Sequence, residues 1–350
     1  MKSVATARKK SSANLFPDMD NKHFNRFKAW MRWFLIIVCS IISFTMYAEE
    51  KPIPQTKSAL NIDEATAAKL GIVFETVEIE VEGLKKDYAF LWMADFHLIA
   101  DDISEVEEKS VNVIQKRLHN FTSPYNGKSS LENWKLLPDC INKSGADAIL
   151  FGGDICDFGS LANIRALKEG MHKLTLPYMY ARADHDVAPW WLAAKKPEEV
   201  NELEKSIDGY APVLVLEFDD LMIVGINVST SNMTAAGLAR FKEAYAKRKP
   251  IILVTHVPID PLVEPRVGEV YKERDPKRRN LTWGDDCYYK PNAYTREFID
   301  LVCAEDSPVK TVLAGHLHFS WHGMLTKTIS QHLFVPSYKG NIGIIRVKAK

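Results

Sequence analysis

Residues 148–157 of the chain read AILFGGDICD, and this stretch joins a short apolar run to two glycines and two carboxylates. An apolar run of this length, bounded by turn residues, is typical of a strand that is buried on both faces. Gly152 and Gly153 then indicate a turn directly after the strand. The sequence therefore predicts that Asp154 and Asp157 lie just past the end of a buried strand.

The same arrangement, an apolar run followed by residues that bind divalent metals, recurs along the chain. Its five motifs are Asp95-Phe-His97, Gly153-Asp154-Ile-Cys-Asp157, Asp184-His185-Asp186, Thr255-His256 and Gly315-His316-Leu-His318, which hold five of the 10 histidines. Each motif alone also fits a turn or a core histidine with its hydrogen bonds satisfied. Together they favour a metal centre, because a buried cluster of acids and imidazoles is costly without a cation.

Apolar runs and helical periodicities alternate along the chain. The predicted strands are Ile72 to Val81, Tyr88 to Met93, Ala148 to Phe151, Tyr178 to Ala181, Ile251 to Val254 and Val309 to Leu313. The predicted helices are Asn61 to Leu70, Ile103 to Leu118, Glu132 to Ser144, Leu161 to Leu174, Glu198 to Ile207, Thr234 to Lys247 and Asn292 to Ala304. This alternation predicts an α/β fold, in which ligands bind at the carboxyl ends of the strands.

Carboxylates and imidazoles in this number suit a pair of cations. Two cations about 3.5–4 Å apart activate a bridging water, orient a phosphate and neutralise the charge of an in-line displacement. Oxygen and nitrogen ligands of this kind favour Mn²⁺, Fe²⁺ or Fe³⁺, or Zn²⁺ over metals that prefer thiolates. The motifs therefore predict a two-metal phosphoesterase with two divalent metal ions as cofactors.

In their order and spacing, the motifs resemble the pattern D-x-H, G-D-x-x-D, G-N-H-D/E, H and G-H-x-H of the calcineurin-like metallophosphoesterase superfamily. The resemblance covers residues 72–350. It implies a four-layer α-β-β-α sandwich, with two sheets flanked by helices. It also implies a hydrolase of phosphodiesters or phosphomonoesters that uses a dinuclear metal centre and a bridging hydroxide.

The resemblance implies a role for each matching residue. One metal would be held by Asp95, His97 and His318, and the second by Asp184, His256 and His316. Asp154 would bridge both metals. As catalytic residue, His185 would stabilise the phosphate or protonate the leaving oxygen, and Asp157 would orient it by a hydrogen bond.

Two adjacent residues depart from the family pattern. Asp184 stands where the family has Asn, and Ala183 where it has Gly. An added negative charge should hold the second cation more firmly, yet it weakens that cation as a Lewis acid. The carboxylate also removes an amide donor toward the phosphate. We expect catalysis to persist, with a changed rate, pH optimum or metal preference.

The formal net charge of zero hides an asymmetry between the two ends of the chain. Residues 1–48 hold eight Lys or Arg against two Asp, so this leader carries +6 and the remainder −6. A remainder of negative charge without a basic stripe argues against general nucleic-acid binding. We expect a basic leader over residues 1–48, a linker and short helix over 49–71, and a catalytic domain over 72–350.

The leader contains an uncharged apolar run, Trp33 to Ala48, behind Arg32. Its final Met-Tyr-Ala fits a signal-peptidase site. At 16 residues the run is shorter than the ~20 residues of a membrane-spanning helix, but an uncleaved anchor remains an alternative. Either reading predicts export, with the catalytic domain periplasmic, extracellular or anchored outside the cytoplasm, and membrane association through residues 30–48 if the leader is retained.

Other residues have less specific signals. Four cysteines outside the leader match neither a disulfide scaffold nor a zinc knuckle, which favours free thiols. Arg182 fits either a phosphate contact or an ion pair, and Trp190 and Trp191 fit either packing or stacking on a substrate. The irregular stretch Asp260 to Pro291 fits either a surface insertion or the wall of a substrate pocket.

Two other functions fit the same residues. An exported, metal-bound binding module with weak or no catalysis is consistent with Asp184. A membrane-anchored hydrolase of lipid or cell-envelope phosphates is consistent with the apolar leader. A phosphate-ester substrate is common to both hydrolase interpretations, and the substrate itself depends on the pocket walls rather than on the fold.

Overall fold

The computed structural model describes residues 60–62, 64–100, 102, 108–187, 197–207, 210–274, 276, 277, 279–285 and 287–350. Predictions for the leader and for residues 49–59 of the linker lie outside the described residues, as do Trp190 and Trp191. Within the described part of the chain, no helix has both the length and the apolar character needed to cross a membrane.

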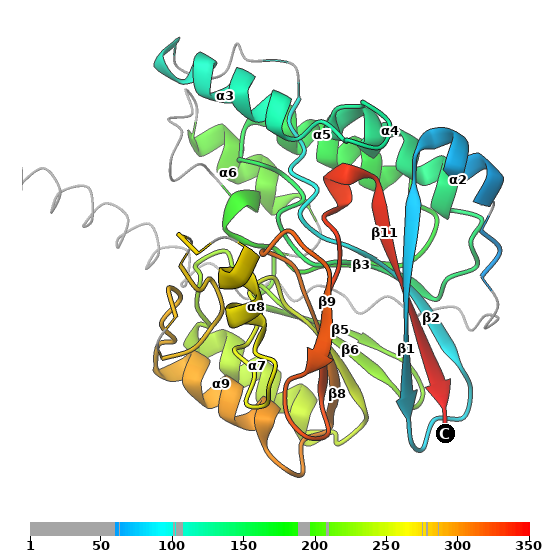
Figure 1. Ribbon diagram of the computed structural model, residues 1–350, viewed down its shortest axis with the longest axis vertical. Helices are drawn as coiled ribbons and strands as arrows, with labels where there is room; N and C mark the ends of the chain where they lie inside the picture. Colours follow the sequence, from blue (N-terminus) through cyan, green and yellow to red (C-terminus); the bar gives the residue numbers. More distant parts are fainter. Residues whose placement is uncertain are drawn as a thin grey trace, which may run out of the picture. The chain divides into compact units, whose positions relative to one another are not determined.

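Two sheets form the centre of the described part of the chain (Figure 1). The first has the order β1 (Val73–Val81), β11 (Asn341–Ala349), β2 (Tyr88–Met93), β3 (Ala148–Phe151) and β4 (Tyr178–Tyr180). The second has the order β5 (Val213–Glu217), β6 (Met222–Ile226), β7 (Ile251–Val254), β8 (Val309–Ala314), β10 (Ser330–Leu333) and β9 (Trp321–Met324). Both sheets are mixed, because each contains parallel and antiparallel pairs.

Helices cover the outer faces of both sheets. Their bounds are α2 (Glu64–Leu70), α3 (Glu108–Asn120), α4 (Ser130–Ile141), α5 (Leu161–His172), α6 (Pro197–Lys205), α7 (Ala235–Ala246), α8 (Val267–Arg274) and α9 (Ala293–Cys303). Trp134 of α4 and Leu167 of α5 pack with the outer face of the first sheet. Phe241 of α7 and Phe298 of α9 pack with the outer face of the second sheet.

The alternate side chains of strand β3 pack into two different apolar cores, one on each face of the sheet. Ile149 and Phe151 join the core under α4 and α5, whereas Ala148 and Leu150 join the core between the two sheets. All four side chains are fully buried. Strand β7 divides its residues in the same way between the helices and the first sheet. Alternate residues thus build three apolar cores, and the predicted four-layer α-β-β-α sandwich is confirmed.

The predicted elements all appear within the described residues, some with the predicted bounds and others with shifted ends. For example, the predicted helix Glu132 to Ser144 begins two residues earlier, because Ser129 caps it. The Ser129 hydroxyl accepts a hydrogen bond from the Glu132 amide, and the Glu132 carboxylate accepts one from the Ser129 amide. Among the described residues, Cys156, Cys287 and Cys303 have free thiols, as predicted.

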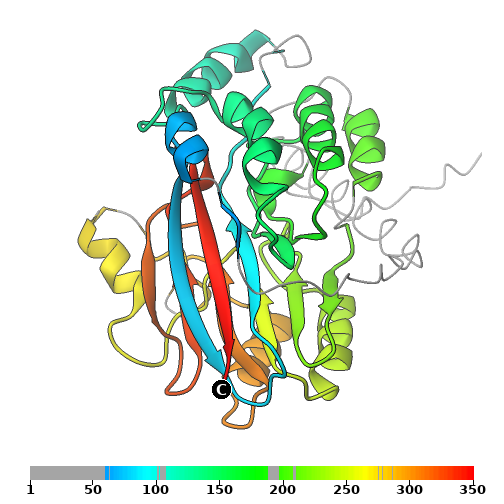
Figure 2. The ribbon, with the colours of Figure 1, turned by 90° about the vertical axis from the view of Figure 1, so that its right-hand side faces the viewer.

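Several elements were missed by the sequence analysis. Strands β5, β6, β9, β10 and β11 were not predicted, and the stretch Asp260 to Pro291, taken as irregular, contains helix α8. The largest omission is β11, which lies between β1 and β2 (Figure 2) and pairs parallel with the first and antiparallel with the second. Such long-range pairing has no local sequence signature, because the partners are some 250 residues apart in the chain.

Candidate metal centre

The predicted motifs meet where four central strands end. Asp95 follows β2, Asp154 follows β3, His256 follows β7 and His316 follows β8. Backbone hydrogen bonds continue past the strand ends and hold these loops together: the Asp95 amide donates to the Gly153 carbonyl over 3.0 Å, and the Gly315 amide to the His256 carbonyl over 3.0 Å. The residues therefore gather at the carboxyl edge of the sheets, as predicted for an α/β fold.

The loops place their side chains through an uncommon backbone conformation. Among the described residues other than glycine, positive φ angles occur at seven positions. Five of these are predicted metal ligands: Asp95, His97, Asp154, His316 and His318. Left-handed backbone at a residue other than glycine costs of order 1–3 kcal/mol, and such strain concentrates at functional sites. Left-handed backbone at residues other than glycine is therefore concentrated in this cluster among the described residues.

The residue between two ligands in a motif has a packing role. Phe96 lies between Asp95 and His97 and is 3% exposed, and Leu317 lies between His316 and His318 and is 2% exposed. Both join apolar cores. The D-x-H and H-x-H spacings therefore turn the two polar side chains toward the centre while the middle side chain anchors the loop.

Two glycines allow the loops to approach each other closely. A Cβ atom on Gly315 would lie 2.6 Å from an Asp95 carboxylate oxygen, and one on Gly153 would lie 2.9 Å from Nδ1 of His256. Gly153 also has a φ angle of +89°. A side chain at either position would displace a predicted ligand.

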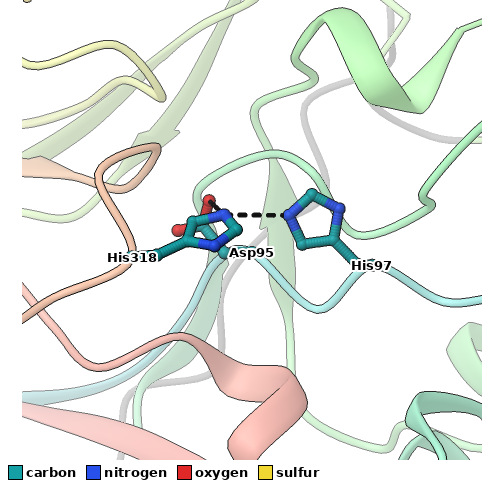
Figure 3. A group of neighbouring side chains, drawn as sticks. All are labelled: Asp95, His97 and His318. Atoms are coloured by element: carbon teal, nitrogen blue, oxygen red, sulfur yellow. Dashed lines mark hydrogen bonds and ion pairs between the residues drawn. The ribbon is translucent and has the colours of Figure 1, made fainter. Parts of the chain in front are cut away.

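Three overlapping groups of potential ligands are found among the described residues, and Asp95, His97 and His318 form the first (Figure 3). The Nε2 atoms of His97 and His318 face each other at 3.0 Å, and Nε2 of His318 lies 3.2 Å from Oδ1 of Asp95. The His316 amide donates to both oxygens of Asp95 over 3.0 Å, which fixes the orientation of this carboxylate. Three potential ligand atoms thus converge on one point.

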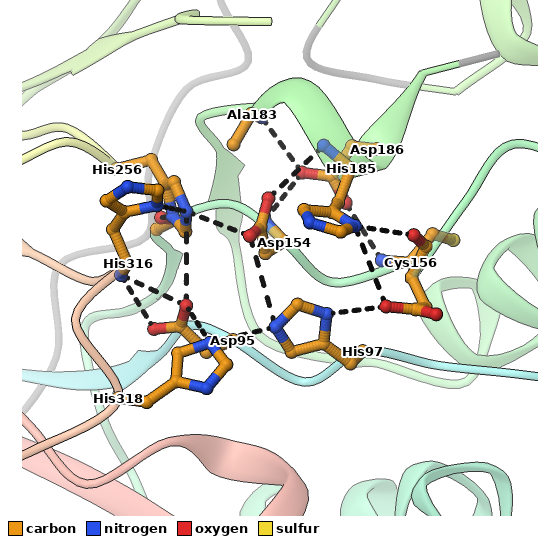
Figure 4. Close-up of polar contacts among 12 residues, drawn as sticks. Asp95, His97, Asp154, Cys156, Ala183, His185, Asp186, His256, His316 and His318 are labelled. Carbon is orange, nitrogen blue, oxygen red and sulfur yellow. Dashed lines mark hydrogen bonds and ion pairs between the residues drawn. The ribbon is translucent and has the colours of Figure 1, made fainter. Parts of the chain in front are cut away.

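Asp154, His256 and His316 form the second group (Figure 4). Nε2 of His256 lies 3.0 Å from Oδ2 of Asp154 and 3.3 Å from Nδ1 of His316. The same Asp154 oxygen lies 3.9 Å from Nε2 of His97, in the first group. Asp154 therefore stands between the two groups, in the position that a bridging ligand requires.

The donor set fits divalent cations. Two imidazole nitrogens that face each other need a proton or a cation between them, and Nε2 of His316 is buried without a hydrogen-bond partner in the described structure. Burial and the charge of His256 lower the pKa of His316 to about 3, so its imidazole is neutral, the form that binds metals. Burial opposes ionisation of Asp154, but neighbouring His256 and His185 hold its pKa well below the usual range.

Hydrogen bonds from Nδ1 leave the Nε2 atoms of two histidines free for a metal. Nδ1–H of His97 donates to Oδ1 of Asp157 over 2.9 Å, and Nδ1–H of His256 donates to the Gly152 carbonyl over 2.9 Å. Such partners fix the tautomer and the ring orientation of metal-binding histidines.

Asp157 differs from its predicted role. Its carboxylate binds His97 and the guanidinium of Arg117, and its Oδ1 is 3.6 Å from Nδ1 of His185, beyond hydrogen-bond range. His185 instead donates from Nδ1 to the Asp157 carbonyl over 2.6 Å. Asp157 thus orients His185 through its backbone and His97 through its side chain, because the left-handed His97 brings that ring closer.

His185 and Asp184 occupy different positions relative to these groups. His185 forms the third group with His97 and Asp154, and its side chain is 19% exposed. Asp184 joins none of the metal-compatible groups found among the described residues. Burial and the neighbouring Asp154 charge raise the pKa of Asp184, so its carboxylate does lie near the shared ligand.

Asp186 and Arg182 support the turn that carries His185. The carboxylate of Asp186 is fully buried and accepts hydrogen bonds from the amides of Asp154, Cys156 and Ala183. Arg182 is 1% exposed, donates to the Asp186 carbonyl over 2.6 Å and pairs with Glu204 at 3.6 Å. Of the two predicted roles of Arg182, the ion pair is the one present, and burial excludes a substrate contact.

Two further side chains lie beside the centre: Arg117, which the sequence did not indicate, and Tyr289, which belongs to the stretch Asp260 to Pro291 predicted as either a surface insertion or a pocket wall. Arg117 comes from α3 and binds Asp157 with two nitrogens. Tyr289 packs against His316 with ring centroids 5.1 Å apart. Neither residue lies in a metal-binding motif, and only the tertiary fold brings them to the site. Arg278 of the predicted pocket wall lies outside the described residues.

Comparisons with known proteins bear on this arrangement. The family model described as calcineurin-like phosphoesterase matches residues 88–320. No curated protein matches the chain by sequence.

Solved structures of three phosphoesterases are similar to the chain. A dimetal phosphatase from Danio rerio has 12% identity and a TM-score of 0.39, with 72% of this chain and 88% of that chain covered. The purple acid phosphatase PPD1 from yellow lupin has 9% identity and a TM-score of 0.41, with 74% and 45% covered. Phosphopantetheinyl hydrolase from Mycobacterium tuberculosis has 10% identity and a TM-score of 0.35, with 73% and 92% covered.

The family match confirms the resemblance seen in the five motifs. It includes every predicted ligand, from Asp95 to His318. Because the match spans more than half of the 350 residues, the chain belongs to the calcineurin-like phosphoesterase family, whose members depend on a dinuclear metal centre.

Proposed function

We propose that the chain hydrolyses phosphate esters at a dinuclear centre that Asp154 bridges. One divalent cation would be held by Asp95, His97 and His318, and the other by Asp184, His256 and His316. The observation that supports this proposal most is the position of the Asp154 carboxylate, 3.0 Å from Nε2 of His256 and 3.9 Å from Nε2 of His97. Two bound cations would supply activation of water and neutralisation of the phosphate charge.

The chain's own residues prepare this centre in advance. The His316 amide orients Asp95, and the His185 amide lies 3.4 Å from Oδ1 of Asp154. Hydrogen bonds from Nδ1 direct the Nε2 atoms of His97 and His256 inward. Ligands held in this way need little rearrangement when cations and substrate bind, which lowers the cost of binding.

His185 is the proposed catalytic residue. Its Nδ1 is occupied by the Asp157 carbonyl, so Nε2 is left to contact the phosphate or to donate a proton to the leaving oxygen. The side chain is partly exposed, in contrast to His97 and His256, which are 2% and 0% exposed. A substrate can therefore reach His185 from solvent.

A metal-bound binding module is the alternative that Asp184 favours. Asp184 replaces the amide donor of the family pattern, and it lies outside both ligand groups. A centre of this kind would still bind a phosphate but turn it over slowly. Retention of His185 and of both ligand groups supports hydrolysis over this alternative.

Metal content and hydrolysis together test the proposal. We expect the purified protein to bind about two metals per chain and to hydrolyse bis-p-nitrophenyl phosphate or p-nitrophenyl phosphate in the presence of Mn²⁺. His185→Ala should keep the metals and lose hydrolysis by about 10²-fold or more. Two metals without turnover, restored by Asp184→Asn, would support the binding module instead.

The cellular location is a separate proposal that rests on the leader sequence. We propose that the catalytic domain acts outside the cytoplasm, either cleaved after Ala48 or anchored by residues 30–48. The mass of the protein from its native membrane and soluble fractions tests both forms. A processed N-terminus at Glu49 would exclude the anchored hydrolase of lipid or cell-envelope phosphates.

A further inference from the structure

Tyr289 stands at the edge of the second ligand group. Its ring packs edge-on against His316, with centroids 5.1 Å apart and an interplanar angle of 75°. The side chain is half-buried, whereas its neighbour Tyr288 is 52% exposed. Two adjacent tyrosines thus have different surroundings, and only Tyr289 faces a predicted ligand.

The backbone around Tyr289 is tied to the strand that delivers His256. Trp283 bridges to both Ile259 and Tyr289. The Trp283 amide donates to the Pro258 carbonyl over 2.8 Å, and the Trp283 carbonyl accepts from the Asp260 amide over 2.8 Å. The Trp283 ring is buried and its indole N–H donates to the Ser231 carbonyl. Tyr289 is therefore held in place by the same loop that follows His256.

The phenol group of Tyr289 is neutral and close to acidic side chains. Burial raises its pKa, and the carboxylates of Asp184 and Asp154 raise it further. No hydrogen bond of its hydroxyl is found among the described residues. A tyrosine hydroxyl without a partner, on a ring that packs against a predicted ligand, is available to a bound molecule.

Among the described residues, two arginines near the centre are already occupied, and His185 is reserved for the proposed catalytic role. Arg117 binds Asp157, and Arg182 is buried in its pair with Glu204. Asp184 offers only acceptor oxygens where the family pattern has an amide. The site therefore lacks, at Asp184, the donor that the family pattern supplies there, and Tyr289 packs against His316, close enough to Asp184 for that carboxylate to raise the tyrosine pKa.

We propose that Tyr289 binds substrate directly, by donating a hydrogen bond from its hydroxyl to a phosphoryl oxygen on the Asp184 side of the centre. Tyr289 thereby replaces the amide donor that the Asp184 carboxylate removes. This inference rests on the proposed phosphoesterase function and adds a specific binding residue to it. A neutral donor suits this position, because it contacts the phosphate without a charge that would pair with Asp184.

The test compares Tyr289→Phe with Tyr288→Phe in the full chain. Metal content is measured first, and inorganic phosphate is then titrated calorimetrically into each metal-loaded protein. Tyr289→Phe should retain its metals and bind phosphate about tenfold more weakly, since a hydrogen bond to a charged group contributes about 1.5–3 kcal/mol. Tyr288→Phe, with its exposed ring, should bind like the wild type.

A double substitution tests whether the Tyr289 hydroxyl takes the place of the amide that Asp184 lacks. Asp184→Asn restores an amide, so Tyr289→Phe should reduce phosphate affinity less in the Asp184→Asn background than in the wild type. Equal losses in the two backgrounds would mean that Tyr289 does not replace the amide, and would overturn that part of the proposal.

The remaining outcomes separate this inference from the proposed function. Unchanged phosphate affinity in Tyr289→Phe, with hydrolysis by the wild type, overturns the inference alone. Loss of metal in Tyr289→Phe also overturns it, because the ring would then support His316 rather than contact phosphate. If Tyr289→Phe binds phosphate more weakly but the wild type hydrolyses no ester, the inference about Tyr289 is retained and the proposed hydrolysis is excluded. A wild type that binds neither metal nor phosphate overturns both.

Discussion

Two clusters of histidine and carboxylate in this chain differ in how their ring nitrogens are partnered. The first is the metal centre, and the second, the edge cluster, consists of Glu75, Ser320, His322, Ser330 and His332. In the edge cluster, Nε2 of His322 lies 2.9 Å from Glu75, and Nε2 of His332 lies 2.9 Å from the Ser330 hydroxyl. The two Nδ1 atoms face each other at 3.2 Å, where one donates and the other accepts.

The backbone also separates the two clusters. His322 and His332 lie directly opposite each other on paired strands β9 and β10, in ordinary strand conformation. At the metal centre five predicted ligands have positive φ, and Nε2 of His316 has no partner. The edge cluster satisfies its own hydrogen bonds, so it is complete without a ligand. The metal centre is strained and incomplete, which is expected where a bound cation repays the cost.

Residue types alone therefore do not identify a metal site. Both clusters contain facing imidazoles and a carboxylate, and His322 lies only four residues beyond His318. Backbone strain and an unpartnered buried nitrogen distinguish the centre, and neither can be read from composition. Three pairs of substitutions test whether this distinction holds in solution.

The largest effect is expected from removing one carboxylate charge in each cluster. Asp154→Asn replaces the shared ligand with a weaker one, so we expect loss of at least one metal per chain and a drop in hydrolysis of about 10²-fold or more. Glu75→Gln should keep the metals and the activity, and lower the free energy of unfolding by about 1 kcal/mol. Metal analysis, ester hydrolysis and denaturant unfolding measure these outcomes. Equal metal loss in both variants would show that the edge cluster belongs to the centre.

An intermediate effect is expected from Arg117, which binds Asp157 and so helps to hold His97. Arg117→Gln leaves the Asp157 carboxylate with His97 alone, and loss of an outer partner of a metal ligand typically costs about 10- to 100-fold in metal affinity. Chelator competition measures this change. Arg296→Gln removes an exposed ion pair with Asp285 and serves as the matched control, with metal affinity unchanged. Normal metal affinity in Arg117→Gln would limit Arg117 to a packing role.

The smallest effect concerns the pH dependence of stability in the edge cluster. Burial and the charge of His322 lower the pKa of His332 to about 4. The unfolded chain, with a histidine pKa of about 6.5, therefore binds more protons than the folded chain between these values. His332 contributes stability that is fully present above pH 6.5 and is lost as the pH falls toward 4.

Between pH 6.5 and pH 5.5, the free energy of unfolding of the wild type should decrease by about 1 kcal/mol more than that of His332→Gln. Denaturant unfolding at several pH values measures the difference between the two proteins, which removes the contribution of other titrating groups. His172→Gln, on an exposed residue of α5, should follow the wild type. A His332→Gln protein with the same pH dependence as the wild type would contradict the prediction.

Local signals explain why much of the fold was predictable. Continuous apolar runs such as β2 and β7 have the predicted bounds, because a strand buried on both faces needs an unbroken apolar segment. Strand β11 was missed, since its pairing with β1 and β2 depends on residues at the other end of the domain. At the site, Asp157 does hydrogen-bond to His185, but through its backbone carbonyl, and its carboxylate contacts His97 and Arg117, a division that sequence order does not state.

The amino-acid sequence was enough to predict the α/β class and the family and to propose the residues that carry the chemistry, because buried strands and metal-binding motifs are local patterns of residue type and spacing. The tertiary structure alone decided which residues share a group, that Asp154 lies between the two groups, and that Arg117 and Tyr289 border them. It also separated His322 from the centre despite its proximity in sequence. The physical reason is that contacts between distant segments depend on strand register and loop conformation, which all elements of the fold set together.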